Sequence, residues 1–296
     1  MSSTDAARVG VSAVQLDGLV RSGQLVRVRR AAYALRTAYD AADLEGRYRL
    51  RTKAILRSRP RHDAASHHAA LLLHGVDTYD VDLGVVDVVS RVKAPRVRSG
   101  LRTHPGTGLI ADRASGWNVV LVPTALCQVA GGSGTVAAVS AMDDALHDGR
   151  CTVEQLRQGV AFVPEHHRLA AERAIALTDP ACESVGETRT RLLLRDLDFE
   201  VETQRVLRRG RAFLARVDFL VDGLVVVEFD GLVKYAGHDG RAALAAEKAR
   251  ESAIVDLGYA VVRLVWTDLA DPAEVARRIR AARTRAVNRR GLVAGA

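Results

Sequence analysis

Aromatic residues and cysteine are both scarce in this sequence. Phe, Trp and Tyr together make up 4% of the 296 residues, and the three cysteines are far apart without any C-x-x-C spacing. A chain with so few, isolated cysteines and no secretory signal is typical of a reducing compartment. We therefore expect a cytoplasmic protein.

Long apolar runs are also missing. No run approaches the ~20 residues that a membrane helix needs, and the stretch 119–130 is interrupted by Pro123, Thr124 and Gln128. We expect no membrane partner. At this length the chain should instead form two or three packed units, each large enough to bury a core of its own.

Basic residues are abundant. Lys and Arg number 43 against 35 Asp and Glu, so that the formal net charge is +8. Such an excess favours a polyanionic partner, because clustered cations release counterions from phosphates. An arginine-rich proteome would give the same excess. Clustering of the basic residues would favour the polyanionic partner over this second explanation.

The N-terminal 36 residues contain such a cluster. Ser12 can cap a helix with apolar residues at helical spacing, and Gly23 ends that helix. Beyond the glycine, apolar residues alternate with Arg27, Arg29 and Arg30, which favours a short basic β-hairpin. Helix, turn and basic hairpin in this order are typical of the end of a winged-helix domain. We therefore predict that residues 1–60 bind DNA and that the three arginines contact its phosphates.

Residues 61–178 predict a middle α+β domain. Alternating β-branched and polar residues between 76 and 122 favour strands, and the stretch 124–157 favours helices. The segment from Ser66 to Gly75 predicts a helix that carries His67, His68 and His74. Their spacing fits no common zinc pattern, and no carboxylate or cysteine accompanies them, so we interpret these histidines as structural.

Residues 179–296 predict a third domain, which begins at the linker Asp179-Pro180. Its pattern is helix, three strands, helix and strand. A strand that returns to the sheet after a helix is expected to be parallel to its neighbour, which gives a mixed sheet flanked by helices. The expected elements are a helix over 185–196, strands over 199–207, 211–221 and 224–230, a helix over 240–257 and a strand over 259–266.

Two carboxylates lie in the middle of apolar strands. Asp218 occurs in Arg-Val-Asp-Phe-Leu and Glu228 in Val-Val-Val-Glu-Phe-Asp-Gly. Burying both at sheet depth is costly unless a cation compensates them, and a hard ion such as Mg²⁺ or Mn²⁺ prefers oxygen ligands. The alternative is that each pairs with an arginine such as Arg216 or Arg263.

The turn at Asp222-Gly223 decides whether these acids can share an ion. In a two-residue hairpin, Asp218 and Glu228 would lie on opposite faces of the sheet. A three-residue loop with Gly223 in the left-handed region shifts the register by one residue and brings both to the same face. The metal site therefore requires the longer loop or a bulge.

Other candidate site residues lie on the flanking helices and one loop. Glu187 opens the first helix in Ser184-Val185-Gly186-Glu187, where it can cap the helix or bind the metal. Lys248 lies on the second helix, and Lys234 and His238 follow the Glu228 strand. Any of these three could reach a phosphate or a water molecule.

The two ends of the chain resemble two known families. The N-terminal order of elements resembles the DNA-binding domain of AbiEi-type antitoxins, and residues 183–270 resemble Vsr-like endonuclease domains of the PD-(D/E)XK type. The family's acid-x-Lys element is here Glu228-Phe229-Asp230, so the lysine would come from Lys248 or Lys234. The markers are Ser184-x-x-Glu187, Val217-Asp218-Phe219, Val227 to Gly231, Lys234-Tyr235, Glu247-Lys248 and Leu257-Gly258-Tyr259.

This resemblance implies a Mg²⁺- or Mn²⁺-dependent DNA endonuclease. Asp218 and Glu228, helped by Glu187 and the Phe229 carbonyl, would hold the metal, and a lysine would orient water or stabilise charge. The alternative is a regulator of the antitoxin type, with a catalytically inactive nuclease-like domain and DNA, a toxin or a second copy of the chain as its partner.

Overall fold

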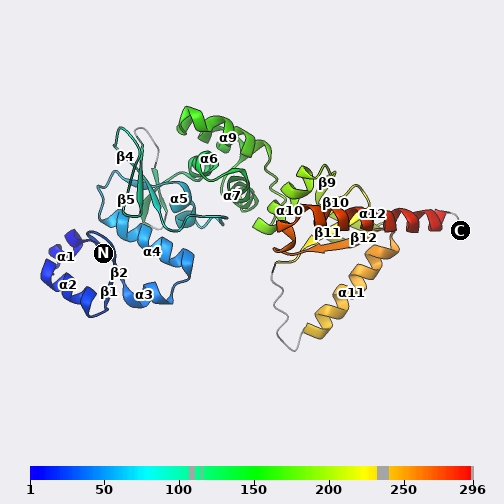
Figure 1. The fold of residues 1–296 in the computed structure, drawn as a ribbon, viewed down its shortest axis with the longest axis horizontal. Coiled ribbons are helices and arrows are strands. Elements are labelled where there is room, and N and C mark those ends of the chain that lie inside the picture. Colours follow the sequence, from blue (N-terminus) through cyan, green and yellow to red (C-terminus); the bar gives the residue numbers. More distant parts are fainter. Residues whose placement is uncertain (107–110, 115, 232–239, 295–296) are drawn as a thin grey trace. The chain divides into compact units, whose positions relative to one another are not determined.

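The computed structural model describes residues 1–106, 111–114, 116–231 and 240–294 (Figure 1). The chain is mixed α/β and divides into two compact units, Met1–Thr178 and Asp179–Ala296. The second unit starts at the residue where we place the linker, whereas residues 1–60 and 61–178 belong to one unit. No helix in the described ranges is long and apolar enough to cross a membrane.

The first unit begins with two short helices and a hairpin. Ser12 caps α2 through a reciprocal bond with Gln15, and Gly23 follows the helix with a φ of 75°. Leu16 and Tyr33 pack in a small core of this part. The expected helix, turn and hairpin are therefore confirmed. The elements are α1 (Ser3–Arg8), α2 (Ala13–Arg21), β1 (Leu25–Arg29), β2 (Ala32–Leu35), α3 (Arg36–Ala41) and α4 (Leu44–Arg57).

A mixed sheet follows, with strand order β5-β6-β4-β3-β8-β7. The parallel pair β4 and β6 places Asp87 beside Arg102 and Val89 beside His104. The expected helix after Ser66 is confirmed as α5 (His67–His74), and Gly75 ends it with a φ of 77°. The strands are β3 (Ala64–Ala65), β4 (Val86–Ser90), β5 (Arg96–Arg98), β6 (Leu101–Pro105), β7 (Ala111–Ala114) and β8 (Trp117–Val120).

Helices complete the first unit. Much of helix α6 is buried, since every residue from Thr124 to Ala130 is buried. It contacts the helices before and after it, and their shared core is mostly apolar but includes the buried polar residues Thr124, Gln128, Ser140 and Asp143. The elements are α6 (Val122–Gly132), α7 (Thr135–His147), α8 (Val153–Gly159), the 3-10 turn η1 (Val160–Phe162) and α9 (Glu165–Ala176).

The second unit has the expected order of helix, three strands, helix and strand. Its sheet order is β12-β11-β10-β9, and β11 and β12 are parallel while the other pairs are antiparallel. The mixed sheet predicted from the sequence is thus confirmed (Figure 1). The elements are α10 (Val185–Asp196), β9 (Val201–Arg209), β10 (Ala212–Val221), β11 (Val225–Phe229), α11 (Gly240–Asp256), β12 (Ala260–Leu264), the 3-10 turn η2 (Asp268–Ala270) and α12 (Pro272–Ala294).

Each face of this sheet has its own apolar cluster. Phe219 and Val227 pack with residues of α10 and α12, including Ile279. Leu220 and Val226 pack instead with Ile254 of α11. Val225, Val226 and Val227 alternate between the two clusters along β11, whereas in β10 Val217 belongs to the second cluster and Phe219 to the first, so that the alternation is interrupted between them.

Candidate functional site

The hairpin between β10 and β11 has the longer of the two loops considered above. Val221 pairs with Val225, so that Asp222, Gly223 and Leu224 form the loop. The Leu224 N–H donates a 3.0 Å hydrogen bond to the Val221 carbonyl oxygen. Asp222 and Gly223 have φ values of 49° and 64°, both in the left-handed region. This is the three-residue loop that the shared metal site requires.

The resulting register places Asp218 opposite Glu228. Phe219 pairs with Val227, and the next positions toward the open end of the hairpin are the two acids. By alternation Glu228 lies on the face that carries Val226, and the charge of Asp218 raises the pKa of Glu228, so that the two carboxylates lie near each other. The Phe229 N–H donates a 2.8 Å hydrogen bond to Asp218 Oδ2, which joins the two strands at this point.

The electrostatics of the pair favour a cation. Burial raises the pKa of Asp218 to about 6, against the Phe229 hydrogen bond, and the nearby Glu187 adds to the rise. Burial also raises the pKa of Glu228 to about 7, followed in effect by the charge of Asp218. Both carboxylates are thus less stable in their ionised form than in water, and a divalent cation between them would reverse this.

The arginines that could have neutralised these acids have other partners. Arg216 forms an ion pair with Glu183 at 2.6 Å. Arg263 pairs with Glu247 and Glu251 of α11 and with Asp230. Among the residues that the structure describes, neither Asp218 nor Glu228 forms an ion pair.

Ser184 caps α10 by accepting a hydrogen bond from the Glu187 N–H at 3.2 Å. The two oxygens of Glu187 accept hydrogen bonds from the Glu183 N–H at 3.0 Å, the Ser184 hydroxyl at 2.9 Å and the Gln204 side-chain amide at 2.9 Å. Its backbone donor thus precedes the cap and is not an amide of the first turn, so the expected capping box is formed only in part. The charge of Glu187 raises the pKa of Asp218, but among the described residues the ligand atoms of these two acids and Glu228 do not all lie within 4.8 Å of one another.

Arg250 is a cation near the two acids that sequence reasoning missed. The charge of Arg250 lowers the pKa of both Asp218 and Glu228, against the larger effect of burial. Lys248 is exposed on the same helix, and Lys234 and His238 lie outside the described residues. Arg250 precedes the buried Ile254 by one helical turn, and this i, i+4 spacing is the signal that could have identified it.

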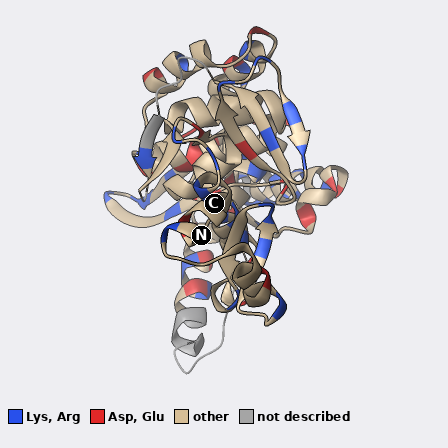
Figure 2. Cartoon of the chain, turned by 90° about the vertical axis from the view of Figure 1, so that its left-hand side faces the viewer, with Lys and Arg blue, Asp and Glu red and all other residues tan. Residues whose placement is uncertain are grey.

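Two of the three arginines of the N-terminal hairpin are engaged within the first unit. Arg27 forms an ion pair with Asp17 and lies over the Tyr33 ring. Arg29 donates to the Arg98 carbonyl oxygen at 3.3 Å, whereas Arg30 is exposed. In Figure 2 segments that carry Lys and Arg are interspersed with segments that carry Asp and Glu.

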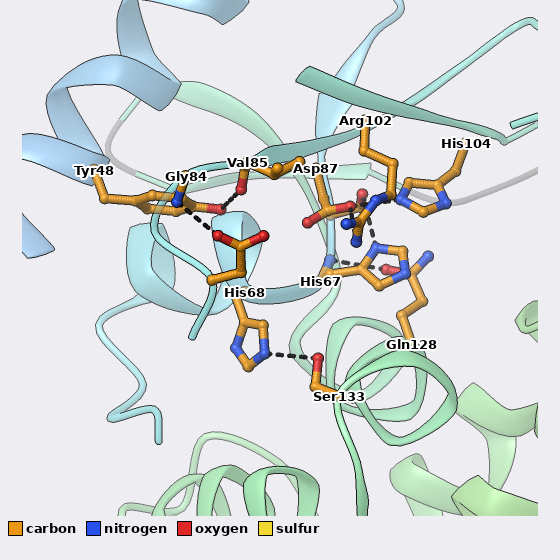
Figure 3. A network of polar contacts seen from close by, with 12 residues as sticks. Tyr48, His67, His68, Gly84, Val85, Asp87, Arg102, His104, Gln128 and Ser133 are labelled. Atoms are coloured by element: carbon orange, nitrogen blue, oxygen red, sulfur yellow. Dashed lines mark hydrogen bonds and ion pairs between the residues drawn. The ribbon is translucent and has the colours of Figure 1, made fainter. Parts of the chain in front are cut away.

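The structure corrects one premise of our interpretation of the three helical histidines, namely that no carboxylate accompanies them. His67 lacks a carboxylate neighbour in the sequence, but in the fold it faces Asp87 of β4 and His104 of β6 (Figure 3). The ligand atoms of these three residues all lie within 4.8 Å of one another, and no other described group of three His, Cys, Asp or Glu side chains does so. Only the parallel pairing of β4 with β6 brings the two strands together, which spacing along the chain does not reveal.

The other two histidines of this helix have hydrogen-bond partners of a structural kind. His68 Nε2 lies 3.0 Å from the Ser133 hydroxyl, and His74 Nε2 lies 2.9 Å from the Val120 carbonyl oxygen. Burial lowers the pKa of both His67, to about 3, and His68. His67 and His68 are therefore neutral near pH 7.

The chain matches no protein-family model and no curated protein. What it does has to be inferred from two groups of side chains, the carboxylates of the second unit and the histidine cluster of the first.

Proposed function

We propose that the second unit is a metal-dependent DNA endonuclease of the PD-(D/E)XK type. The observation that carries this proposal is the register of one hairpin, in which Asp218 and Glu228 follow the pair of Phe219 with Val227 and lie close enough for the charge of Asp218 to raise the pKa of Glu228. The order of helix, three strands, helix and strand supports the same fold type. Function is inferred from the site, because a fold by itself does not specify one.

The residues present suit Mg²⁺ or Mn²⁺. Asp218 Oδ2 is held by the Phe229 N–H, which orients the carboxylate and leaves Oδ1 for an ion. Glu228 and the Phe229 carbonyl would supply further oxygen ligands, as a hard cation prefers. Glu187 would not bind the ion directly, because its carboxylate already accepts three hydrogen bonds.

Phosphodiester hydrolysis needs negative charge to be neutralised and a water molecule to be positioned. The bound ion would neutralise charge on the scissile phosphate and activate the water. Arg250 adds a fixed positive charge near both acids, which suits stabilisation of the charge that develops in the transition state. Lys248 or Lys234 remains the proposed donor in place of the missing acid-x-Lys lysine.

The first unit would bring the DNA to this site. Its helix and hairpin have the order of a winged-helix ending, and Arg30 is the exposed arginine at the turn. We propose that these residues contact phosphates and do not read bases, because arginines on a short hairpin supply charge without a groove-filling helix.

A regulator of the AbiEi antitoxin type is the second candidate, and one observation favours it. Asp230 occupies the position where the nuclease pattern has its lysine, and it pairs with Arg263 at 3.5 Å. A domain without that lysine could retain the fold while it binds a toxin or a second copy of the chain. DNA binding by the first unit would then be the whole activity.

Plasmid nicking by the full chain separates the two candidates. With Mg²⁺ or Mn²⁺ we expect nicking that EDTA abolishes and that Asp218→Asn or Glu228→Gln reduces by a factor on the order of 10² or more. Glu202→Gln is the matched control, because Glu202 is an exposed acid of the neighbouring strand that pairs with Arg205. Nicking that persists in both acid variants would exclude Asp218 and Glu228 from the nuclease site, and nicking that is missing from the unaltered chain would leave only the regulator.

A further inference from the structure

The histidine cluster of the first unit is a second group of side chains arranged as metal ligands. His67 comes from the start of α5, Asp87 from β4 and His104 from β6, so that three separate elements contribute to it. His104 Nε2 lies 2.7 Å from Asp87 Oδ1, and the rings of His67 and His104 stack with their centroids 4.2 Å apart. In Figure 3 the three side chains lie against one another.

Neighbouring residues hold these side chains in place. The ring nitrogen Nδ1 of His67 lies 3.1 Å from the Ser66 hydroxyl, and the backbone N–H of His67 donates a 3.1 Å hydrogen bond to Gln128 Oε1. Arg102 approaches Asp87 Oδ1 at 3.5 Å. A hydrogen bond to one ring nitrogen fixes the tautomer of a histidine and presents the other nitrogen to an ion, which is the usual arrangement around metal-binding histidines.

His67 is also held in a costly backbone conformation. Its φ is 51°, in the left-handed region that a β-carbon disfavours. Strain of this kind persists only where the surrounding structure imposes it, and it gathers at functional sites. The Asp87–His104 hydrogen bond alone would not require His67 to adopt this conformation.

The cluster opens into a cavity of about 730 Å³. His68, Tyr48 and Arg102 line it, together with His166 and His167 at the start of α9. His68 is 5% exposed, and its Nδ1 is buried without a hydrogen-bond partner among the described residues. A buried polar atom of this kind is costly unless a ligand or a water molecule satisfies it.

We propose that His67, Asp87 and His104 bind one divalent transition-metal ion, of the Zn²⁺ or Fe²⁺ class, whose remaining coordination positions face this cavity. Two imidazoles and one carboxylate are the protein ligands that such ions prefer, whereas Mg²⁺ prefers a set composed of oxygens. Three protein ligands beside a cavity leave room for water or substrate on the metal. This site lies in the first unit and does not depend on the nuclease proposal.

Equilibrium dialysis of the full, untagged chain tests the proposal, with Zn²⁺ as the probe and Mg²⁺ in excess. We expect one Zn²⁺ per chain that Mg²⁺ does not displace. Co²⁺ should occupy the same site and give visible absorption bands whose intensity reports its geometry. Binding of Mg²⁺ in preference to Zn²⁺, or no stoichiometric Zn²⁺, would overturn the assignment.

Four variants place the ion. His67→Gln, Asp87→Asn and His104→Gln should each weaken Zn²⁺ binding on the order of 100-fold. His166→Gln is the control, because it changes a cavity histidine outside the cluster. Far-UV circular dichroism identifies any variant that does not fold. His67→Gln then decides the question through the Co²⁺ spectrum.

The doubly changed chain Asp218→Asn, Glu228→Gln keeps this test apart from the nuclease proposal. It should bind Zn²⁺ as the unaltered chain does, whatever happens to nicking. If it loses the Zn²⁺, the ion belongs to the second unit. If His67→Gln and Asp87→Asn both retain full Zn²⁺ affinity and an unaltered Co²⁺ spectrum, the cluster is only a hydrogen-bonded structural feature.

Discussion

The backbone N–H of Phe229 donates a 2.8 Å hydrogen bond to Asp218 Oδ2, across the strand pair that carries both proposed metal ligands. The bond has two consequences. It orients one oxygen of Asp218 toward the partner strand, and it satisfies a backbone donor at the end of β11. Asp218 therefore stabilises the fold as a hydrogen-bond acceptor, and in the proposed site it would bind the metal through its negative charge. Substitutions can separate these two roles.

Asp218→Asn should preserve the stability of the chain, whereas Asp218→Ala should lower it. The asparagine oxygen can still accept from Phe229, and the change removes repulsion from Glu228, so we expect stability equal to that of the unaltered chain or higher. Alanine leaves the Phe229 N–H without its acceptor, at a cost of about 1–3 kcal/mol. Urea unfolding in EDTA measures both. A structural ion pair at Asp218 predicts a loss of about 3–5 kcal/mol for the asparagine variant as well, and that outcome would refute a metal role.

The stability of the metal-free chain should fall as the pH rises from about 4 to about 7. Burial raises the pKa of Asp218 to about 6 and that of Glu228 to about 7, above the values of an unfolded chain near 4. The folded state therefore binds more protons within this range, and ionisation at its upper end removes stability. We expect a loss of about 1–2 kcal/mol after allowing for solvent screening of these partly buried groups.

Unfolding free energies at pH 5 and pH 8 in EDTA measure this loss. The doubly changed chain Asp218→Asn, Glu228→Gln should lose less stability between the two pH values than the unaltered chain. Mg²⁺ should restore part of the stability at pH 8 but not at pH 5, because protons compete with the ion for the same oxygens. Equal pH dependence in both chains would mean that the two acids do not titrate in this range.

Gly186→Ala should damage the second unit although it lies in a helix. A β-carbon at Gly186 would lie 1.9 Å from Phe229 Cε1, so the ring, and with it the strand end that holds Asp218, would have to move. Alanine favours a helix by about 1 kcal/mol over glycine, but overpacking costs about 1–3 kcal/mol and should prevail. Gly18→Ala is the control, since nothing lies within 4 Å of its β-carbon position in α2. Thermal unfolding of both variants checks the sign, and a stabilised Gly186→Ala would contradict the packing described here.

Local signals in the sequence predicted the elements of the second unit well. Ser184 begins α10, Gly258 follows α11 with a φ of 86°, and Gly223 lies in the turn. Capping residues and glycines act within a few residues, so their positions limit where helices and turns begin and end. The apolar stripe of α12, with Val275, Ile279, Ala282 and Ala286, would have predicted that helix too.

The sites depend on contacts that no local signal specifies. The register of β10 and β11 was open until the loop length was known, because one residue of slip reverses the face of Asp218. The approach of His67 to Asp87 and His104 follows from strand order in a sheet whose neighbours are not consecutive in the chain. Arg250 reaches the acids only because α11 packs over them. Long-range pairing of this kind is set by the whole core.

Arg30→Ala should reduce the salt dependence of DNA binding more than Arg27→Ala does. Arg30 is exposed, whereas Arg27 already forms an ion pair with Asp17 that DNA would have to displace. A single phosphate contact contributes a slope of about 0.9 in the logarithm of the binding constant against that of the salt concentration. Fluorescence anisotropy over a range of salt concentrations measures the slope. Equal, unchanged slopes for both variants would remove the hairpin from the DNA interface.

Arg250→Gln should impair cleavage more than Lys248→Gln. The charge of Arg250 reaches both Asp218 and Glu228, while Lys248 is exposed on the same helix. Loss of one charged group that stabilises a transition state costs on the order of 10²- to 10³-fold in rate, and we expect that range for Arg250→Gln. The two changes are matched in length and in the charge removed. The ratio of their single-turnover rates at saturating Mg²⁺ therefore compares the two positions directly.

Arg250→Gln should also shift the acidic limb of the pH–rate profile to higher pH, because removal of a nearby positive charge raises the pKa of both carboxyl groups. A merely structural arginine would not move that limb. A slower Lys248→Gln variant, together with an unchanged pH–rate profile for Arg250→Gln, would contradict this prediction. Lys248 would then be the cation that acts in the site, and Arg250 would have a structural role only.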